Sequence, residues 1–451
     1  MRTTRLRIVL LVALCAGFVA GQLSFSVDAR RRAREARAEL VEGTVRDAPV
    51  GVRHLEQLRE LGYVEGTADP SPELRGVLLY DRERACPGLN LYSSRIRTEA
   101  RLVDMEGREV HRWSHPGPDG WEHVELLGDG SLLVVVNEAE ILKLDRDSQL
   151  LWRRETRAHH DLDVHPDGDI YALTHRRGLR PEIHPTIPVV EDLVEILGPD
   201  GELRSRISIL DAMRRSPFAF VLVSPGALPS DRREGDIPHL DLLHTNHVQV
   251  LDGSLSDRSP LFARGHLLLS MRTVNAIAIL DPEREVVVWM WGPNNLHRQH
   301  HPTLLPNGRI LIFDNGRERS QIVEMDPLNR EVAWRYAPEL GFLSRFRGSV
   351  QRLENGNTLI TESDTGHVFE VTPEGRKVWR FANPDVTADG VRIAIWRMER
   401  FAPGELAFLA DSEAGAGRGR RRARMEDHHP PGLDGDTDRG PAATAGESFA
   451  T

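Results

Sequence analysis

Three histidine motifs recur along the chain in the same local setting: His159-His160-Asp161, His244-Thr245-Asn246-His247 and Gln299-His300-His301. Each precedes a short apolar run that ends in a turn and is followed by a second apolar run. Histidine titrates near neutral pH and serves as a nucleophile, a general acid or base, or a metal ligand. If a repeated unit brings the three motifs together, they form one reactive site.

The repeated unit is a strand-turn-strand pattern between about Gly76 and Asp411. Its turns are Gly128-Asp129-Gly130, Pro166-Asp167-Gly168, Pro306-Asn307-Gly308 and Glu354-Asn355-Gly356. Asp-Gly and Asn-Gly turns of this kind join antiparallel strands. The pattern predicts strands after the turns at 131–136, 169–174, 309–313 and 357–361, and third strands at 140–145, 193–197, 275–281, 321–326 and 367–371.

A tryptophan closes most of the repeats, at Trp113, Trp152, Trp289, Trp334 and Trp379. The first two and the last two are separated by about one propeller blade, which is roughly 40–45 residues long. Four strands per repeat and about six repeats predict an all-β fold, a six-bladed β-propeller. We expect the tryptophans to fill the apolar wedges between blades.

The distance of each histidine from its turn glycine predicts where it lies in a blade. His160 lies eight residues before Gly168, and His300 lies eight before Gly308. His244 precedes a longer connection, whose turn is either Gly253 or Gly265. Seven residues after a turn glycine come His175, Asn315 and, if Gly265 is the turn, Arg272. Because the two positions face each other across an antiparallel hairpin, one rim should carry His160, His175, His244, Asn246, Arg272, His300 and Asn315.

The residue types on this rim favour chemistry on an oxyanion. Three histidines can hold zinc, but an arginine at the same level repels a metal ion, so we expect neither a metal nor another cofactor. Arginine presents a planar fork to oxyanions. A histidine can attack phosphorus or sulfur and hold the transferred group, while the other side chains stabilise charge on its oxygens. The alternative is that these side chains only link neighbouring blades by hydrogen bonds, as polar residues at strand ends of propellers often do.

Three stretches of the chain resemble the bacterial arylsulfate sulfotransferases. They are His159-His160-Asp161 before Pro166-Asp167-Gly168, His244-Thr245-Asn246 before Ser270-Met271-Arg272, and Gln299-His300 before Phe313-Asp314-Asn315-Gly316. The resemblance covers roughly residues 76–411. It implies a six-bladed propeller that moves a sulfuryl group from an aryl sulfate ester to a phenolic acceptor, without the nucleotide donor PAPS.

The resemblance also implies roles for individual residues. His300 matches the transiently sulfated nucleophile, while His160, His244 and Arg272 match the residues that bind and stabilise the sulfuryl group. Asn246 matches a supporting sulfate contact, and we add His175 and Asn315 as substrate-binding residues from their place on the rim. Either His160 or His244 could protonate the leaving phenolate. Residues 253–264 form an extra loop that we expect to reshape the mouth of the pocket.

Two other classes of function remain open from the sequence. One is a non-catalytic propeller of the cell envelope that binds an anionic ligand or a protein. The other is a metal-dependent hydrolase or lyase that uses the same histidine rim. Arg272 beside His300 favours sulfuryl transfer over the metal enzyme, and the complete set of four residues favours it over a scaffold.

Composition excludes several partners. The 451-residue chain has a net charge of −10, which makes it a poor nucleic-acid binder. Its two cysteines, Cys15 and Cys86, cannot form a cysteine-rich metal site or a disulfide framework. The oligomeric state stays open.

The chain ends differ from the repeats. Residues 6–25 are mostly apolar, with Arg2 and Arg5 before them and Arg7 near their start, which is typical of a secretory signal or an N-terminal membrane anchor. We expect residues 1–29 to tether the protein to the inner membrane, with the propeller in the periplasm. Residues 30–75 should form a helical spacer and linker, residues 76–411 the propeller, and residues 412–451 a disordered tail.

Overall fold

The computed structural model describes residues 66–117, 120–223, 239–339 and 341–409. The expected membrane segment at residues 6–25, the helical spacer up to residue 65 and the tail from residue 412 lie outside these ranges. In the described part, no helix combines the length and apolar character needed to cross a bilayer. The predicted signal or anchor, spacer and tail therefore stay predictions.

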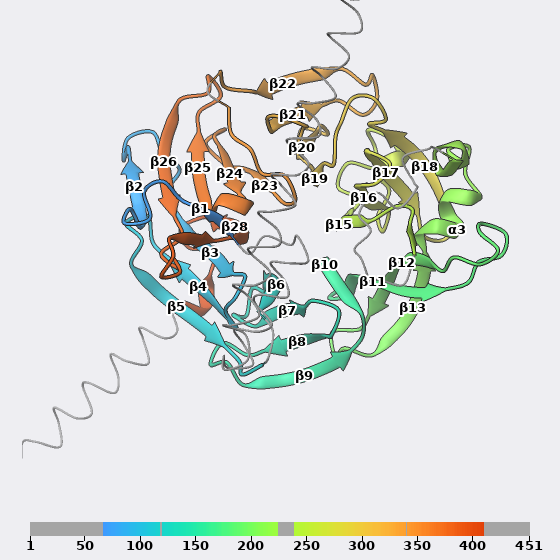
Figure 1. The fold of residues 1–451 in the computed structure, drawn as a ribbon, viewed down its shortest axis with the longest axis horizontal. Helices are drawn as coiled ribbons and strands as arrows, with labels where there is room; N and C mark the ends of the chain where they lie inside the picture. The colour runs from blue at the N-terminus through green and yellow to red at the C-terminus, as the bar shows by residue number, and fades with distance from the viewer. Residues whose placement is uncertain (1–65, 118–119, 224–238, 340, 410–451) are drawn as a thin grey trace, which may run out of the picture.

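Six blades of antiparallel strands are arranged in a ring (Figure 1), which confirms the predicted six-bladed propeller. The innermost strands are β6 (Trp121–Leu126), β10 (Ala158–Val164), β15 (Thr245–Val250), β19 (His300–Leu304), β23 (Ser349–Arg352) and β28 (Ile395–Phe401). The second strands are β7 (Leu132–Val136), β11 (Ile170–Gly178), β16 (Leu267–Met271), β20 (Ile310–Asp314), β24 (Thr358–Glu362) and β3 (Leu89–Ser94).

The outer half of each blade is built from two further strands. The third strands are β8 (Glu140–Leu144), β12 (Val189–Leu197), β17 (Ala276–Asp281), β21 (Gln321–Met325), β25 (His367–Val371) and β4 (Glu99–Val103). The outermost strands are β9 (Leu150–Glu155), β13 (Leu203–Ser208), β18 (Val286–Trp291), β22 (Val332–Tyr336), β26 (Lys377–Ala382) and β5 (Glu109–Ser114). Short helices add to the blades: α3 (Ile209–Arg214), η1 (Ala219–Val223), η3 (Pro260–Phe262) and η4 (Ser363–Thr365).

Strands from distant parts of the chain close the ring. β28, the last strand described, is the innermost strand of the blade that β3, β4 and β5 complete. β2 (Gly76–Tyr80) adds a fifth strand beside β26 of the preceding blade. β1 (Gly66–Ala68) pairs with β27 (Val391–Ile393). Residues 66–68, inside the predicted spacer and linker of residues 30–75, therefore belong to this two-stranded sheet.

Burial along the strands follows from their place in the blade. All five residues of β7, β16 and β20 are buried, because both faces of these middle strands pack against neighbouring blades. Outermost strands such as β9 and β22 are mostly exposed or half-buried. The second strands begin one residue later than the sequence predicts, and β11 continues to Gly178, four residues beyond its predicted end.

The closing tryptophans join one blade to the next, but only three of them are buried as predicted, since Trp152 and Trp334 are half-buried. Each lies on an outermost strand, and its indole N–H donates over 2.9–3.0 Å to a carbonyl in a turn of the neighbouring blade. Trp113 and Trp379 are fully buried. The acceptors of Trp113, Trp152, Trp289, Trp334 and Trp379 are the carbonyl oxygens of Gly130, Pro199, Pro327, Pro373 and Met105.

The extra loop of residues 253–264 lies away from the histidine rim, which corrects the prediction that it shapes the pocket mouth. It follows the end of β15, whereas His244 precedes its start, and six strand residues separate the two by roughly 20 Å. Arg258 in this loop donates to Asp326 Oδ2 at 3.1 Å, and Arg264 lies 3.6 Å from Asp167. The loop therefore braces the turns of the two adjacent blades at the far face.

Candidate active site

β-bulges shape the start of five of the six innermost strands. The pairing register shifts between Trp121 and His123, Ala158 and Leu162, Thr245 and His247, His300 and Thr303, and Ile395 and Met398. His160, His244 and His301 adopt positive φ angles of 62°, 49° and 49° at or beside these bulges. A bulge turns side chains away from the regular alternation of a strand. These bulges therefore set the directions in which the side chains of the histidine motifs point.

His160 and His244 face each other across the boundary between two blades. Their Nε2 atoms are 3.2 Å apart. The outer nitrogen of each ring faces a carboxylate: His160 Nδ1 lies 3.3 Å from Glu122 Oε1, and His244 Nδ1 lies 2.5 Å from Asp241 Oδ2. Trp396 stacks on the His160 ring with centroids 5.6 Å apart and planes 18° from parallel. The two imidazoles are therefore held edge to edge in a fixed orientation.

His300 is held by Asn315, its neighbour across the β19–β20 hairpin. The Asn315 amide nitrogen donates to the carbonyls of Ser344 and Arg347 at 2.7 and 2.9 Å, so its oxygen must face His300 Nδ1, 2.7 Å away. An amide oxygen only accepts, so Nδ1 carries the ring proton and Nε2 keeps its lone pair. Burial is the main cause that lowers the His300 pKa well below its ordinary value; the Asn315 hydrogen bond opposes it and the charge of Arg272 adds to it.

Arg272 brings positive charge to the same place. Its backbone N–H donates to the His244 carbonyl at 3.1 Å, which places it at the predicted end of its blade. Burial is the main cause that lowers the pKa of both His160 and His300, and the charge of the Arg272 guanidinium lowers both pKa values further. The charges of His160 and His244 also lower the pKa of His300. The structure therefore gathers His160, His244, Arg272 and His300 within electrostatic reach of one another.

Two of the predicted substrate-binding residues, Asn246 and His175, contact protein groups other than the His300 side chain. Asn246 donates from Nδ2 to the Gln299 carbonyl at 3.0 Å and so ties one blade to the next. His175 lies 3.2 Å from Glu138 Oε2, and the ring beside it is His159, at 4.9 Å, and not His160 as the hairpin count predicted. The bulge between Ala158 and Leu162 shifts that register.

An open cavity of ≈ 540 Å³, including space continuous with solvent, adjoins the His160–His244 pair. His300 and Arg272 are not among the residues that line it. All of the lining side chains except Val190 are polar or charged: Glu122, Asn137, Glu138, His159, His160, His175, Arg177, Asp192, His239, Asp241 and His244. The cavity offers a polar approach to the pair.

Comparison with known proteins decides which family this site belongs to. The profile of the family described as Arylsulfotransferase (ASST) matches residues 123–384, which is more than half of the chain and includes His160, His244, Arg272 and His300. The chain belongs to the arylsulfotransferase family. The resemblance drawn from the sequence is thereby confirmed. No curated protein sequence matches the chain.

Solved structures similar to this arylsulfotransferase are distant. A protein of unknown function from Bacteroides caccae is 13% identical, with a TM-score of 0.47, and the match covers 70% of this chain and 99% of that one. A streptogramin B lyase is 12% identical, with a TM-score of 0.41, over 75% and 96% of the two chains. The virginiamycin B lyase from Staphylococcus aureus is 12% identical, with a TM-score of 0.39, over 72% and 89%. These likenesses carry no argument about function.

Carboxylates around the arylsulfotransferase histidines were missed in the sequence. Glu122 and Asp241 face the histidine pair, and Asp192 accepts the Thr245 N–H at 2.7 Å. Burial, followed by the nearby Asp241 carboxylate, raises the Asp192 pKa to about 6. No carboxylate was among the residues that the sequence predicted for the rim. Even so, no three histidine, cysteine or acidic side chains in the described residues are arranged to hold a metal ion.

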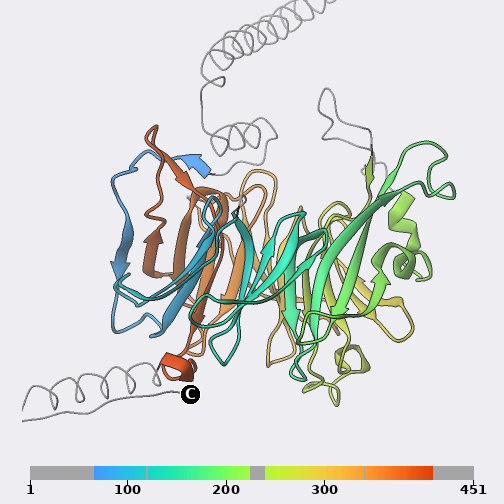
Figure 2. The same ribbon diagram turned by 90° about the horizontal axis from the view of Figure 1, so that it is seen from below.

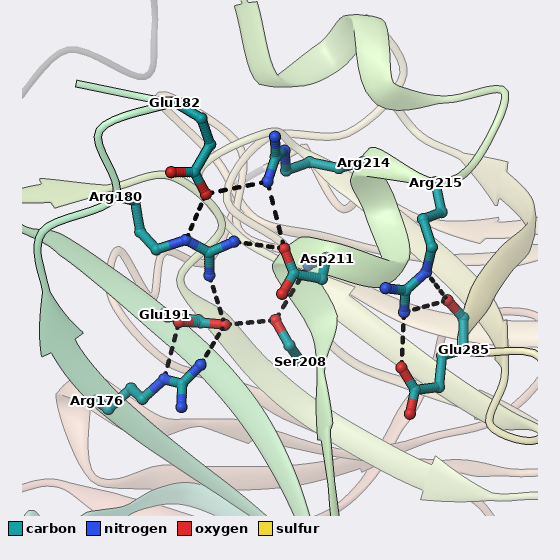
Figure 3. Close-up of polar contacts among 9 residues, drawn as sticks. All are labelled: Arg176, Arg180, Glu182, Glu191, Ser208, Asp211, Arg214, Arg215 and Glu285. Atoms are coloured by element: carbon teal, nitrogen blue, oxygen red, sulfur yellow. Dashed lines mark hydrogen bonds and ion pairs between the residues drawn. The ribbon is translucent and has the colours of Figure 1, made fainter. Parts of the chain in front are cut away.

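An ion-pair network fixes the strand that carries Asp241. β14 (Leu240–Asp241) pairs in parallel with β12, which places Asp241 opposite Val190. The next residue of β12, Glu191, accepts hydrogen bonds from Arg176 and Ser208 and pairs with Arg180, which also contacts Asp211 of α3 (Figure 3). In Figure 2 the β11–β12 hairpin extends beyond one face of the disc. The network thus holds the extension on which Asp241 depends.

His247 and His301 belong to a second cluster on the innermost strands, whereas His159 lies beside His160 and His175. Asp161 contacts His247 Nδ1, accepts a hydrogen bond from Arg397 at 2.8 Å and lies 3.5 Å from His123. The His301 ring lies 4.8 Å from that of His247. Burial opposes ionisation of Asp161, but the Arg397 charge first, and then His247 and His123, outweigh it and hold its pKa well below the ordinary value. This cluster links the innermost strands and is separate from the His160–His244 pair.

Proposed function

We propose that this arylsulfotransferase moves a sulfuryl group from an aryl sulfate ester to a phenolic acceptor through a covalent adduct on Nε2 of His300. The observation that carries the proposal is the hydrogen bond between His300 Nδ1 and Asn315 Oδ1. It leaves a neutral, buried imidazole whose free lone pair is on Nε2, and an uncharged imidazole is the nucleophilic form.

The transfer takes place in two displacements at sulfur. His300 Nε2 attacks the donor, the bond from sulfur to the aryl oxygen breaks, and an aryloxide leaves with a proton from the site. The adduct is an imidazolium whose Nδ1–H still donates to Asn315, so the amide oxygen stabilises the developing positive charge. The acceptor hydroxyl then attacks sulfur, gives up its proton and restores neutral His300.

Arg272 and the histidine pair supply the positive charge that the sulfuryl oxygens need. Arginine donates several N–H groups in one plane, which suits the oxygens of a sulfuryl group in transit. Because an aryl sulfate already carries a stable leaving group, this scheme needs neither PAPS nor any other nucleotide. A supporting sulfate contact from Asn246 would use the N–H that its bond to the Gln299 carbonyl leaves over.

The test is the release of 4-nitrophenol from 4-nitrophenyl sulfate by the purified full chain. We expect release that depends on added phenol and is lost in His300→Ala. His266→Asn is the control, because His266 lies just after the far-face loop and bonds the carbonyl of Leu261 in that loop; nitrophenol release by this variant should match that of the unmodified protein. Phenol-dependent release that survives in His300→Ala would overturn the proposal.

We also propose that residues 6–25 tether the enzyme to the inner membrane with the propeller in the periplasm. The support is the length and the mostly apolar character of residues 6–25 near the N-terminus. Fractionation of expressing cells tests it: the full chain should sediment with membranes and be cut by external protease in spheroplasts, whereas residence in the cytosol would contradict it.

A further inference from the structure

The contacts of the His160–His244 pair determine where its ring protons lie. Each Nδ1 faces a carboxylate, Glu122 at 3.3 Å and Asp241 at 2.5 Å. A carboxylate only accepts hydrogen bonds, so the bond to Asp241 puts a proton on His244 Nδ1, and the nearby Glu122 carboxylate favours the same tautomer of His160. The Nε2 atoms, 3.2 Å apart, would then be two lone pairs facing each other. One additional proton between them turns this repulsion into a hydrogen bond.

The two carboxylates are suited to hold that proton in place. Burial raises the pKa of Glu122 and of Asp241, but the hydrogen bond and charge of the adjoining imidazole outweigh it in both, so each pKa ends below its ordinary value. Both groups are therefore ionised near neutral pH. Two negative charges on either side favour a single positive charge on the pair between them.

We propose that Glu122, His160, His244 and Asp241 form a chain that stores one proton between the two imidazoles, gives it to the leaving aryloxide and recovers it from the acceptor hydroxyl. This inference rests on the proposed sulfuryl transfer. Asp241 is nearer to its histidine than Glu122 is, which places the stored proton on His244 Nε2, donating to His160 Nε2. Glu122 and Asp241 are positioning residues that act through the histidines.

The stored proton balances the reaction. When the S–O bond of the donor breaks and the S–Nε2 bond to His300 forms, the proton moves from the pair to the aryloxide. When the acceptor oxygen attacks sulfur and the S–Nε2 bond breaks, the acceptor proton returns to the pair. No external acid or base is consumed, and the pair is reset at the end of each cycle.

Other titratable groups around the pair bear on its pH dependence. Burial is the main cause that lowers the pKa of His160, Glu122 raises it, and the charges of His244 and Arg272 lower it again. The further groups that face the pair or its carboxylates are Arg95, His159, Asp192, His239, Arg272 and His300.

The test compares donors with different leaving groups in Asp241→Asn and Glu122→Gln. Either substitution weakens the binding of the stored proton to the histidine pair. This loss should slow the reaction most when the leaving aryloxide is a strong base, because that aryloxide depends most on receiving a proton. We expect kcat with phenyl sulfate to fall about 10- to 100-fold, and kcat with 4-nitrophenyl sulfate to fall only a few-fold. The alkaline limb of the pH profile should also move to lower pH, because the pair loses its proton more easily. Either variant suffices if the other does not fold.

The control is Glu138→Gln, which removes a carboxylate from the same cavity that faces His175 instead of the pair. We expect it to change both donors by the same factor. Equal losses for both donors in Asp241→Asn and Glu122→Gln, with an unmoved alkaline limb, would overturn the inference. If those variants still form the His300 adduct, the sulfuryl transfer itself stands; absence of the adduct in the unmodified protein would instead defeat the proposed function.

Discussion

The amide oxygen of Asn315 lies 2.7 Å from Nδ1 of His300, and its amide nitrogen donates to two backbone carbonyls. Those two donations prevent the amide from rotating by half a turn, so Asn315 can only accept from His300. One buried asparagine therefore fixes both the tautomer and the orientation of the proposed nucleophile. The sequence predicted this pair as hairpin neighbours, eight residues before and seven after Gly308.

Replacing Asn315 by alanine should allow the ring proton of His300 to lie on either nitrogen. We expect kcat to fall about 10- to 100-fold with little change in KM, because the donor site keeps its charges. Asn383→Ala is a matched control, since Asn383 is equally buried and also donates twice, to Ser94 Oγ and the Ile393 carbonyl. It should lower the melting temperature and leave kcat of the folded enzyme unchanged; equal kcat losses in both variants would contradict the role of Asn315.

Replacing Arg272 by glutamine should weaken transfer and shift its pH dependence. We expect kcat/KM for the aryl sulfate to fall about 100-fold or more, with Arg272→Lys in between because it keeps the charge without the fork. The Arg272 charge lowers the His300 pKa, so its loss should raise that pKa and move the acid limb of the profile to higher pH. Arg309→Gln, in a far-face turn, is the control. An acid limb that stays in place would show that Arg272 does not act on His300.

The acidic lining of the cavity predicts a preference among acceptors. Glu122, Glu138, Asp192 and Asp241 face the space beside the histidine pair, with Arg177 as the one arginine in the lining of this cavity. An acceptor that carries an ammonium group should bind better than one that carries a carboxylate. We expect KM for tyramine to be about tenfold below that for 4-hydroxyphenylacetate, which corresponds to about 1.4 kcal/mol. KM values for the two acceptors that become equal in Glu138→Gln would support the acidic lining as the cause of the preference. Equal KM values for the two acceptors in the unmodified enzyme would refute it.

The carboxyl groups of Glu125 on β6 and Glu399 on β28 should make the fold less stable as the pH rises. Burial raises the pKa of Glu125 and Glu399 to about 7, with Glu125 adding to the effect on Glu399 and Arg397 opposing it. The folded state thus holds protons that the unfolded chain releases near pH 4, and the stability they provide is lost between about pH 4 and pH 7. Glu125→Gln should raise the free energy of unfolding at pH 8 by about 1–3 kcal/mol and less at pH 5, measured by urea denaturation. A gain that does not depend on pH would contradict the assignment.

Local sequence features carried most of the prediction of the fold. Asp-Gly and Asn-Gly turns located the second strands of four blades to within one residue at their starts, and the recurring tryptophans indicated how blades join. Arg272 was placed correctly from Gly265, because the hairpin geometry holds once the long connection is counted as a loop. These signals are short-range, so a single sequence suffices to show them.

The parts that could not be predicted depend on contacts between distant segments. The bulge at Ala158–Leu162 moved His159, and not His160, beside His175, and no residue in that stretch marks a bulge. Asp241 reaches His244 from a two-residue strand held by β12. Glu122 and Trp396 come to His160 from two other innermost strands. Their roles appear only after the ring of blades closes.

The central claim is that His300 carries the sulfuryl group, and its most direct test is the mass of the protein during turnover. The full chain is mixed with 4-nitrophenyl sulfate without acceptor, quenched at alkaline pH, and examined by intact mass spectrometry and peptide mapping. We predict a gain of one sulfuryl group on His300 that disappears when phenol is added. An unmodified His300, or an adduct on another residue, while phenol-dependent release of nitrophenol continues would contradict the account.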